Sequence, residues 1–378
     1  MDLKEKALDY HSKFKGKIAT HVYQPITSRD ELSLAYTPGV AEVSRAISQD
    51  KEKVYDYTIK SHTVGVITDG SAVLGLGNIG PEAALPVMEG KAALFKTFAD
   101  IDAFPICLGT QDSQEIIKAV RLLAPVFGGI NLEDISAPRC FEIEDSLQDL
   151  GIPVMHDDQH GTAVVCLAGL INAAKVVGKD LASLKVVISG AGAAGNAITK
   201  ILTGKVADIV VIDSKGVINK SRTDLDPYKQ RLVSSTNKYS IEGGLAEALV
   251  KADIFIGVSK AGLLTPEHIK LMNPDPIIFA MANPVPEIMP ELAREAGAKV
   301  VASGRSDYPN QVNNSLAFPG IFKGALSVRA ARITEKMKYA AALALAGLVP
   351  DPTEDKIIPG PFDPGIVDAV SKAVASAI

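Results

Sequence analysis

The segment LKVVISGAGAAGNAITKIL, residues 184–202, decides the fold of this chain. An apolar run leads directly into Gly190, Gly192 and Gly195, and a helical pattern follows. In this setting the first glycine permits a tight turn, the second lets the backbone approach a pyrophosphate, and the third allows the helix to pack closely on the strand. The helix N-terminus stabilises the phosphate charge. The segment, with Ala193 and Ala194 inside it, therefore predicts a Rossmann-type dinucleotide site.

The next apolar run, ADIVVID, ends in Asp213. Its offset from the glycines is the roughly 20 residues expected of the acid that binds a ribose hydroxyl pair. Asp213 favours NAD, because it would repel the 2′-phosphate of NADP. Lys215 and Arg222 lie close enough in the sequence to accommodate that phosphate, so both cofactors remain open.

A second glycine pattern, Gly75, Gly77 and Gly80, is followed at once by Pro81. No strand that ends in an acid lies at the right distance after it. We interpret this stretch as a loop with glycine-dependent turns and not as a second cofactor site.

Short apolar runs alternate with helical patterns over most of the chain, which predicts an α/β fold with mainly parallel sheet. Strands are predicted at residues 64–68, 103–108, 153–156, 185–189, 209–213, 254–258, 277–281 and 299–302. Helices are predicted at residues 81–98, 114–124, 162–177, 195–203, 245–251, 290–296 and 366–377. We expect an N-terminal substrate and metal domain at 1–160, a doubly wound dinucleotide-binding domain at 161–305, and a helical C-terminal segment at 306–378 that packs back on the body.

Composition excludes several classes of protein. The chain has 378 residues, with 39 Lys and Arg against 44 Asp and Glu, and no long basic run that would favour nucleic acid. No apolar stretch reaches the ~20 residues that a membrane span needs, and the N-terminus does not resemble a signal peptide. Cys107, Cys140 and Cys166 are widely spaced and are expected to be buried thiols. We expect a cytoplasmic protein.

Carboxylates gather after two short apolar runs, as Glu133 and Asp134 in GGINLEDI and as Asp157 and Asp158 in IPVMHDDQHGT. The carboxyl ends of parallel strands line the ligand crevice of such a sheet. Acids that converge there favour a cation, and hard oxygen ligands suit Mg²⁺ or Mn²⁺. Ordinary helix caps and solvated turns are the alternative. Zinc held by the histidines of HDDQH is disfavoured, because Gly161 argues against a continuous helix there and other zinc ligands are missing.

Lys91 lies in ALPVMEGKAALFKTFA, a segment that is apolar on nearly every side. Its ammonium group either reaches out to water or is buried, in which case a lowered pKa would suit a general base. Tyr36, in AYTPGV, is a candidate acid or a packing tyrosine. Asn283 in FAMANPVPEI, and Asn313 and Asn314 in PNQVNNSLAFPG, could bind a substrate carboxylate or the nicotinamide amide, with turn formation as the alternative.

Taken together, these segments resemble the malic enzymes, and specifically their short bacterial form. The similarity runs in order through AYTPGV, TDGSAVLGLGNIGP, PVMEGKA, INLEDI, HDDQHGT, GAGAAG, ANPVPEI and NNSLAFPG. It implies oxidative decarboxylation of L-malate to pyruvate and carbon dioxide, with NAD or NADP and a divalent metal. It also implies a homodimer.

The resemblance also implies roles for individual residues. Tyr36 would be the proton donor and Lys91 the general base. Glu133, Asp134 and Asp158 would hold the metal, with Asp157 beside them. Asn283 and Asn314 would contact substrate or cofactor. Where larger malic enzymes carry an arginine for a malate carboxylate, this chain has Ser71 and Ala72.

Three other functions remain open at this stage. A malolactic enzyme would retain NAD and form lactate. A dehydrogenase that does not decarboxylate would have no need of the carboxylate cluster. A non-catalytic NAD-sensing protein would keep the fold but not the reaction.

Overall fold

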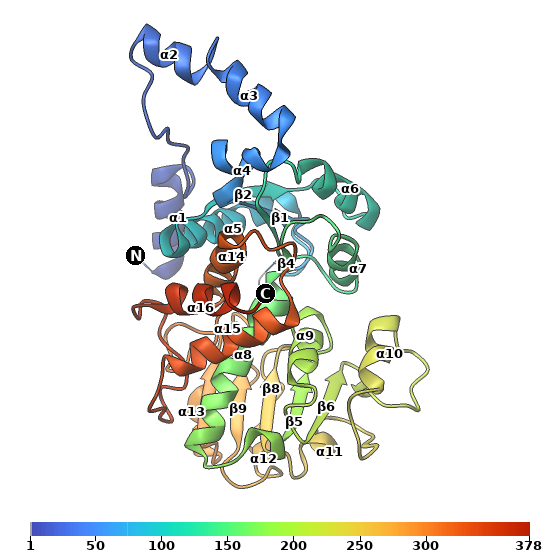
Figure 1. Cartoon of the computed structure of the whole chain (residues 1–378). Helices are drawn as coiled ribbons and strands as arrows, with labels where there is room; N and C mark the ends of the chain where they lie inside the picture. Colours follow the sequence, from blue (N-terminus) through green and yellow to red (C-terminus); the bar gives the residue numbers. More distant parts are fainter. Residues whose placement is uncertain (1, 74) are drawn as a thin grey trace.

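The computed structural model describes residues 2–73 and 75–378. Two parallel sheets form its framework, one above the other in Figure 1, and the C-terminal helices lie between them. One continuous apolar core joins the inner faces of both sheets to the helices between them. A separate apolar cluster covers the outer face of each sheet.

The first sheet has the strand order β2-β1-β3-β4, and all of its neighbouring strands are parallel. Every residue of β1 is buried, as expected of a central strand covered on both faces. The strands are β1 Thr63–Thr68, β2 Asp102–Cys107, β3 Gly129–Leu132 and β4 Val154–His156. The helices that connect them are α5 Pro81–Leu94, which continues as a π turn at Phe95–Ala99, α6 Ser113–Leu123 and α7 Arg139–Ser146.

The second sheet has the order β10-β9-β8-β5-β6-β7, parallel except for the short β7. The order reverses between β5 and β8, which is the crevice where a doubly wound sheet binds its ligand. Its strands are β5 Lys185–Ser189, β6 Asp208–Asp213, β7 Gly216–Val217, β8 Ile254–Gly257, β9 Ile277–Ala280 and β10 Val300–Ser303. Its helices are α9 Ala193–Leu202, α10 Pro227–Val233, α11 Leu245–Leu249, α12 Pro266–Ile269 and α13 Pro290–Glu295. The predicted α/β fold with a Rossmann-type sheet is confirmed.

Helix α8, Asp157–Val176, runs from the end of β4 towards the second sheet. It begins five residues before the predicted start at Thr162, and the expectation that Gly161 interrupts it is wrong. A Cβ at Gly161 would lie 1.8 Å from Oδ1 of Asp157 and 3.1 Å from Cβ of Asn314. Glycine is needed here for close packing inside the helix, and not for a turn.

The C-terminal helices pack on one another, and one of them, α15, packs on α8. Phe318, Phe322, Val370 and Val374 are buried in the shared core, so this segment covers the body of the same chain. The helices are α14 Phe318–Ser327, α15 Glu335–Gly347 and α16 Ile366–Ala375. Short 3-10 turns lie at Lys51–Lys53, Ile59–His62, Leu181–Ser183 and Asn314–Leu316.

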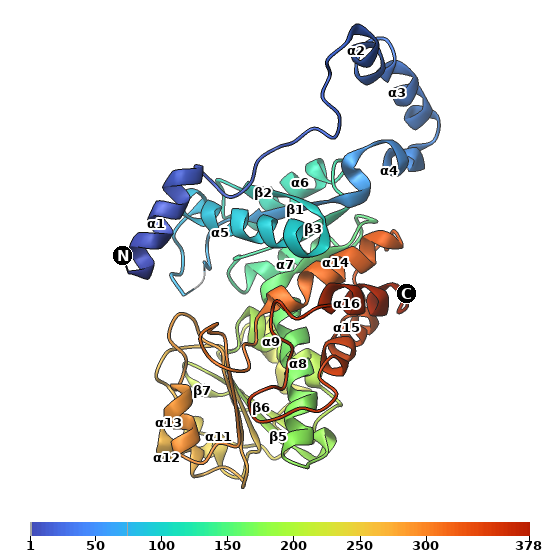
Figure 2. The ribbon, with the colours of Figure 1, turned by 90° about the vertical axis from the view of Figure 1, so that its left-hand side faces the viewer.

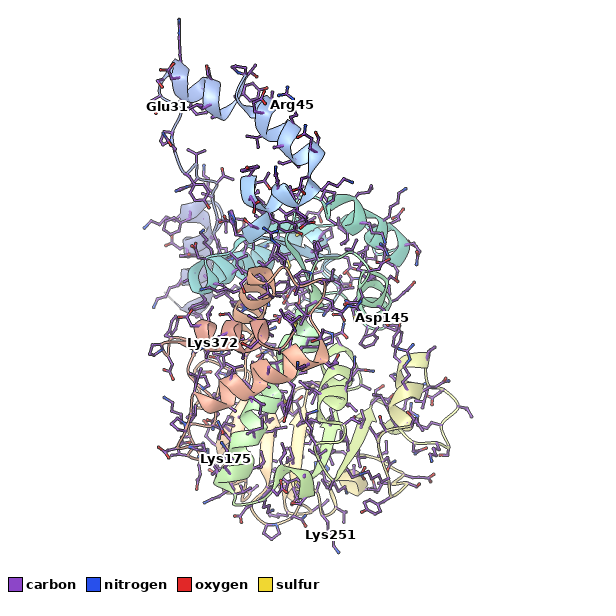
Figure 3. All side chains as sticks on the ribbon, in the orientation of Figure 1. Glu31, Arg45, Asp145, Lys175, Lys251 and Lys372 are labelled. Atoms are coloured by element: carbon purple, nitrogen blue, oxygen red, sulfur yellow. The ribbon has the colours of Figure 1, made fainter. Side chains whose placement is uncertain are left out.

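The N-terminal arm, residues 2–57, behaves differently from the rest of the chain. None of its helices has a buried residue. Figures 1 and 2 show α2 and α3 projecting from the body, and Figure 3 places Glu31 and Arg45 on this projection. The helices are α1 Leu3–Phe14, α2 Arg29–Ala35, α3 Val40–Gln49 and α4 Val54–Tyr57.

Among the described residues, no helix has both the length and the apolar character needed to cross a bilayer. None of the three cysteines is in a disulfide bond. Cys140 and Cys166 are buried, as expected, whereas Cys107 is only partly buried.

Candidate active site

Four carboxylates meet at the carboxyl end of the first sheet. Glu133 and Asp134 follow β3, and Asp157 and Asp158 form the first turn of α8 directly after β4. Because β3 and β4 are parallel neighbours, both pairs emerge at the same edge. Glu133, Asp134 and Asp157 are buried. The N-cap of α8 is His156, which makes no side-chain cap bond, so the reading of this acidic pair as a helix cap is wrong.

Lys91 of α5 lies among these acids. Its Nζ is 2.7 Å from Oδ2 of Asp157 and 2.8 Å from Oε1 of Glu133, and it also lies 4.2 Å from the centroid of the Phe318 ring. The side chain is only 7% exposed, so it does not reach out to bulk water. Sequence-distant residues therefore surround this lysine on several sides.

The proton on Lys91 is held tightly in this arrangement. Burial alone would lower the pKa of Lys91, but the carboxylates of Asp157 and Glu133 raise it well above its ordinary value. The expectation of a lowered pKa for a buried Lys91 is therefore wrong for this state. The apolar sequence around Lys91 gave no sign of the acids that other elements bring to it.

Burial and mutual repulsion act on the pKa of the carboxyl groups in this cluster. Burial raises the pKa of the Glu133, Asp157 and Asp158 carboxyls, and Lys91 offsets part of that rise. Repulsion from neighbouring carboxylates raises the pKa of Glu133 and Asp157 further. An additional cation would relieve this repulsion.

Three of the carboxylates are placed to share one ion. One oxygen from each of Glu133, Asp134 and Asp158 lies within 4.8 Å of the other two. Nearby, Oδ1 of Asp157 is buried without a hydrogen-bond partner among the described residues. An all-oxygen donor set of this kind fits Mg²⁺ or Mn²⁺ and does not fit a structural zinc site.

The histidines of HDDQH do not complete a zinc site. Nε2 of His160 lies 3.0 Å from Glu144 and Nδ1 lies 3.1 Å from Nζ of Lys338, so both of its ring nitrogens are engaged. His156 is fully buried, and its Nδ1 lies 3.9 Å from Oδ2 of Asp158. The only group of possible metal ligands found within the described residues is the three acids.

The dinucleotide turn has the geometry that its sequence predicts. Gly190 has φ of 117°, and a Cβ there would lie 2.6 Å from the carbonyl oxygen of Val258. A Cβ at Gly195 would lie 1.7 Å from the carbonyl oxygen of Gly190, so helix and strand pack closely. A Cβ at Gly192 meets no protein atom within 4 Å, which leaves room for a phosphate. Ala193 and Ala194 begin α9.

Asp213 ends β6, as predicted, and is paired with cations. Arg222 donates to both of its oxygens, at 2.7 and 3.1 Å, and Nζ of Lys229 lies 3.3 Å away. Burial would raise the pKa of Asp213, but these hydrogen bonds lower it below its ordinary value. Lys215 and Arg222, the two candidates for a 2′-phosphate, are both also bound to Asp224.

A cavity of about 570 Å³ opens over the glycine turn. Asp213 and Lys229 lie at one side of it, and Pro138 and Phe141 from the first-sheet half form another part of its wall. The cavity is therefore a cleft between the halves that carry the two sheets. Its size suits a cofactor.

The remaining predicted residues divide into two groups. Asn314 packs against Gly161 and thus lies beside Asp157, at the carboxylate cluster. Asn283 lies after β9, exposed, with its side chain against Gly304. Tyr36 is 66% exposed at the end of α2 on the projecting arm, and this chain does not bring it to Lys91.

The second glycine pattern forms a loop, as predicted. Gly75, Gly77 and Gly80 all have positive φ, at 111°, 77° and 81°. A Cβ at Gly75 would lie 2.1 Å from the carbonyl oxygen of Asn283, so the loop reaches the second half of the chain. Leu74, inside the pattern, lies outside the described residues.

Two neighbours of the site, Asn131 and Glu144, were not found from the sequence. Asn131 of β3 donates to Oε2 of Glu133 at 2.8 Å, and Glu144 of α7 binds the start of α8. Ser71, one of the residues in place of the family arginine, donates to Asp69 at 2.6 Å and accepts from the backbone N–H of Ser136. A polar residue inside the apolar strand GGINL was the one available signal, for Asn131.

Comparison with known proteins places this geometry in a family. Residues 15–115 match the family model of the malic enzyme N-terminal domain, and residues 159–378 match that of the malic enzyme NAD-binding domain. A bifunctional malic/malolactic enzyme of Bacillus subtilis is 57% identical over all of this chain and 93% of its own length. An NADP-dependent malic enzyme of Halomonas elongata is 48% identical, over 99% of this chain and 93% of its own.

A solved structure is similar over the same extent. The crystal structure of an NAD-dependent malic enzyme from Thermotoga maritima matches with a TM-score of 0.96 and 53% identity. The match covers 98% of this chain and 99% of that one. On these matches and on the site described above, this chain belongs to the malic enzyme family.

Proposed function

We propose that this chain catalyses the oxidative decarboxylation of L-malate to pyruvate and carbon dioxide, with reduction of NAD or NADP. The observation that carries this proposal is the position of Lys91. Its ammonium group contacts Asp157 and Glu133 beside the three acids that can share one ion. A lysine that can act as a base when neutral, beside a site for a hard cation and on a dinucleotide fold, is what oxidation of a hydroxy acid requires.

Glu133, Asp134 and Asp158 would hold the divalent cation, either Mg²⁺ or Mn²⁺. When bound, the ion supplies Lewis acidity towards the hydroxyl and carboxylate oxygens of the substrate. Asp157 stays paired with Lys91 and holds the ammonium group of Lys91 beside these acids. Asn314, which packs against the same turn of α8, is proposed to contact the substrate.

Lys91, once its amine is neutral, would take the proton of the malate C2 hydroxyl. The nicotinamide, when bound, would supply the acceptor for the hydride of C2. The carboxylates of Asp157 and Glu133 raise the pKa of Lys91, so a cation that takes up the charge of Glu133 would lower that pKa towards the range of a base. The resulting β-keto acid loses its C4 carboxylate as carbon dioxide, because the ketone accepts the electrons of the broken bond. Enolpyruvate remains.

Tyr36 is proposed to protonate C3 of enolpyruvate, and a homodimer is proposed because of where Tyr36 lies. The arm that carries it has no buried residue, yet exposes several large apolar side chains. Such a surface favours cover by another chain. We propose that the arm packs on a second copy, where Tyr36 would meet the Lys91 cluster of that copy. The apolar side chains are those of Leu3, Leu8, Phe14, Ile18, Val22, Tyr23, Ile26, Leu32 and Leu34.

Mixed dimers test this arrangement. Tyr36→Phe and Lys91→Met chains are each expected to be inactive, but a dimer of one with the other would have one intact site if Tyr36 acts across the interface. Random mixing makes half of the dimers mixed, so about a quarter of wild-type activity should return. If no activity returned after the two chains were refolded together, Tyr36 would not act across the interface.

Malolactic activity is a second candidate, because the Bacillus subtilis relative is a bifunctional malic/malolactic enzyme. The two reactions separate by product. Malate incubated with Mn²⁺ and NAD should give pyruvate and NADH in equal amounts under our proposal. Lactate without NADH would support the malolactic reaction instead.

We propose NAD as the preferred cofactor. Asp213 ends β6, where its charge would repel a 2′-phosphate, and Lys215 and Arg222 are already paired with Asp224. Gly190, Gly192, Ala193, Ala194 and Gly195 would hold the pyrophosphate, and Asn283 would contact cofactor or substrate. A cytoplasmic location is proposed because the cysteines are unpaired. A domain division near residue 160 is proposed because the chain forms two separate sheets.

A further inference from the structure

Glu144 of α7 is a buried carboxylate to which the proposed reaction gives no part. Its side chain is 10% exposed. Oε1 accepts a hydrogen bond from the backbone N–H of His156 at 2.9 Å, and Oε2 accepts from Nε2 of Gln159 at 3.1 Å and from Nε2 of His160 at 3.0 Å. All three donors belong to the start of α8. Glu144 therefore ties the start of α8 to the neighbouring helix α7.

Glu144 holds the start of α8, which has no side-chain cap bond of its own. A helix start has backbone N–H groups without partners in the helix, and a side chain at the N-cap position usually accepts from them. His156 at that position makes no such bond. The carboxylates of the first turn are engaged elsewhere, Asp157 with Lys91 and Asp158 with the backbone N–H of Asp134. Because Glu144 holds this turn, the side chains of Asp157 and Asp158 can both face the cluster.

The hydrogen bonds around Glu144 fix the tautomer of His160. A carboxylate can only accept, so Nε2 of His160 carries the proton and Nδ1 accepts from Nζ of Lys338 at 3.1 Å. Lys338 also donates to Glu335 at 2.7 Å, and Glu335 pairs with Lys200 of α9 at 2.8 Å. The chain of polar contacts joins the acidic turn of α8 to the helix that begins at the dinucleotide turn.

We propose that Glu144 is a positioning residue of the metal site. It holds the first turn of α8 so that the carboxylate of Asp158 remains turned towards Glu133 and Asp134. This inference rests on the proposed function, in which those three acids hold the divalent cation. The effect of Glu144 is then on ion affinity, and only through it on turnover.

The test measures dissociation constants for Mn²⁺ and for NAD in the wild-type chain and in Glu144→Ala. The matched control is Asp253→Ala, because Asp253 is also buried and accepts from the backbone N–H of Lys185 at 3.0 Å, at the other end of the second sheet. Outer partners of metal ligands typically change affinity roughly 10–100-fold. We expect the dissociation constant for Mn²⁺ to rise by that factor in Glu144→Ala and to stay unchanged in Asp253→Ala. NAD binding should be unchanged in both.

Wild-type affinity for Mn²⁺ in Glu144→Ala, or an equal loss in Asp253→Ala, would overturn the inference. A wild-type chain that binds no Mn²⁺ would instead overturn the proposed function, and the wild-type measurement identifies that case. The two failures are therefore distinguishable.

A second set of variants decides the matter if Glu144→Ala does not fold. In Glu144→Gln the amide N–H₂ faces His160, so the ring proton must move to Nδ1, where it meets the ammonium group of Lys338. Lys338→Met removes that conflict. We expect the double variant to bind Mn²⁺ more tightly than Glu144→Gln, and ¹⁵N NMR of the wild-type chain to show His160 protonated on Nε2. The positioning role would be refuted if the two substitutions weakened Mn²⁺ binding additively and if His160 of the wild-type chain carried its proton on Nδ1.

Discussion

The ammonium nitrogen of Lys91 lies 2.7 Å from Oδ2 of Asp157, although the two residues are 66 positions apart. Both side chains are buried, Asp157 completely. Glu133 closes the group at 2.8 Å from the same nitrogen. The cluster therefore depends on charge balance, and removal of any member changes the others.

Lys91→Met should lower both activity and stability. Removing one partner of a buried ion pair costs ~3–5 kcal/mol, and loss of a general base costs roughly 10²–10⁴-fold in kcat. Lys96→Met is the control, since Lys96 pairs with Asp100 and Asp102 at the surface and such pairs contribute about 0–1 kcal/mol. Denaturant unfolding and malate-dependent NADH formation measure the two effects. Unchanged stability in Lys91→Met would argue against the buried pair.

Two glycines of the dinucleotide turn, Gly192 and Gly195, should respond differently to alanine. Gly195→Ala places a Cβ 1.7 Å from the carbonyl oxygen of Gly190, so its melting temperature should fall. A Cβ at Gly192 meets open space, so Gly192→Ala should keep the wild-type melting temperature and weaken NAD binding. Thermal unfolding with NAD titration tests this. A folded Gly192→Ala chain with wild-type NAD affinity would place the pyrophosphate elsewhere.

Asp213→Ser should shift cofactor preference towards NADP. The substitution removes the charge that repels a 2′-phosphate and releases Lys229, while Arg222 retains Asp224 as a partner. We expect the ratio of kcat/KM for NADP to that for NAD to rise roughly tenfold, about 1.4 kcal/mol. Kinetics with both cofactors provide the measurement. An unchanged ratio would mean that Asp213 does not face the ribose.

Glu144 should make stability depend on pH in acid. Burial would raise its pKa, but His160 and His156 lower it to about 2 in the folded chain. The ordinary value of about 4.3 applies in the unfolded chain, so the carboxylate contributes up to ~3 kcal/mol above pH 5 and loses it as pH falls towards 2. The difference in unfolding free energy between wild type and Glu144→Gln should therefore shrink between pH 6 and pH 3.5. A constant difference would contradict this.

Local patterns predicted the fold and half of the site. The glycine turn, Asp213 and the acids after β3 and β4 were found because each depends on one strand end and the residues that follow it. The protonation state of Lys91 was not predicted, because its pKa is determined by Asp157 and Glu133, which lie on other elements of the fold. The start of α8 was also misplaced, because Glu144 of α7 holds it through His156, Gln159 and His160, and because Gly161 serves packing. Such contacts leave no periodic signal in a single sequence.

The most direct test of the central claim is malate-dependent NADH formation by enzyme freed of metal with EDTA, before and after addition of Mn²⁺. The account predicts no turnover without the ion, full recovery with it, pyruvate equal to NADH, and no recovery in Asp158→Asn. Undiminished NADH formation in EDTA would show that the carboxylates of Glu133, Asp134 and Asp158 do not act by holding a cation.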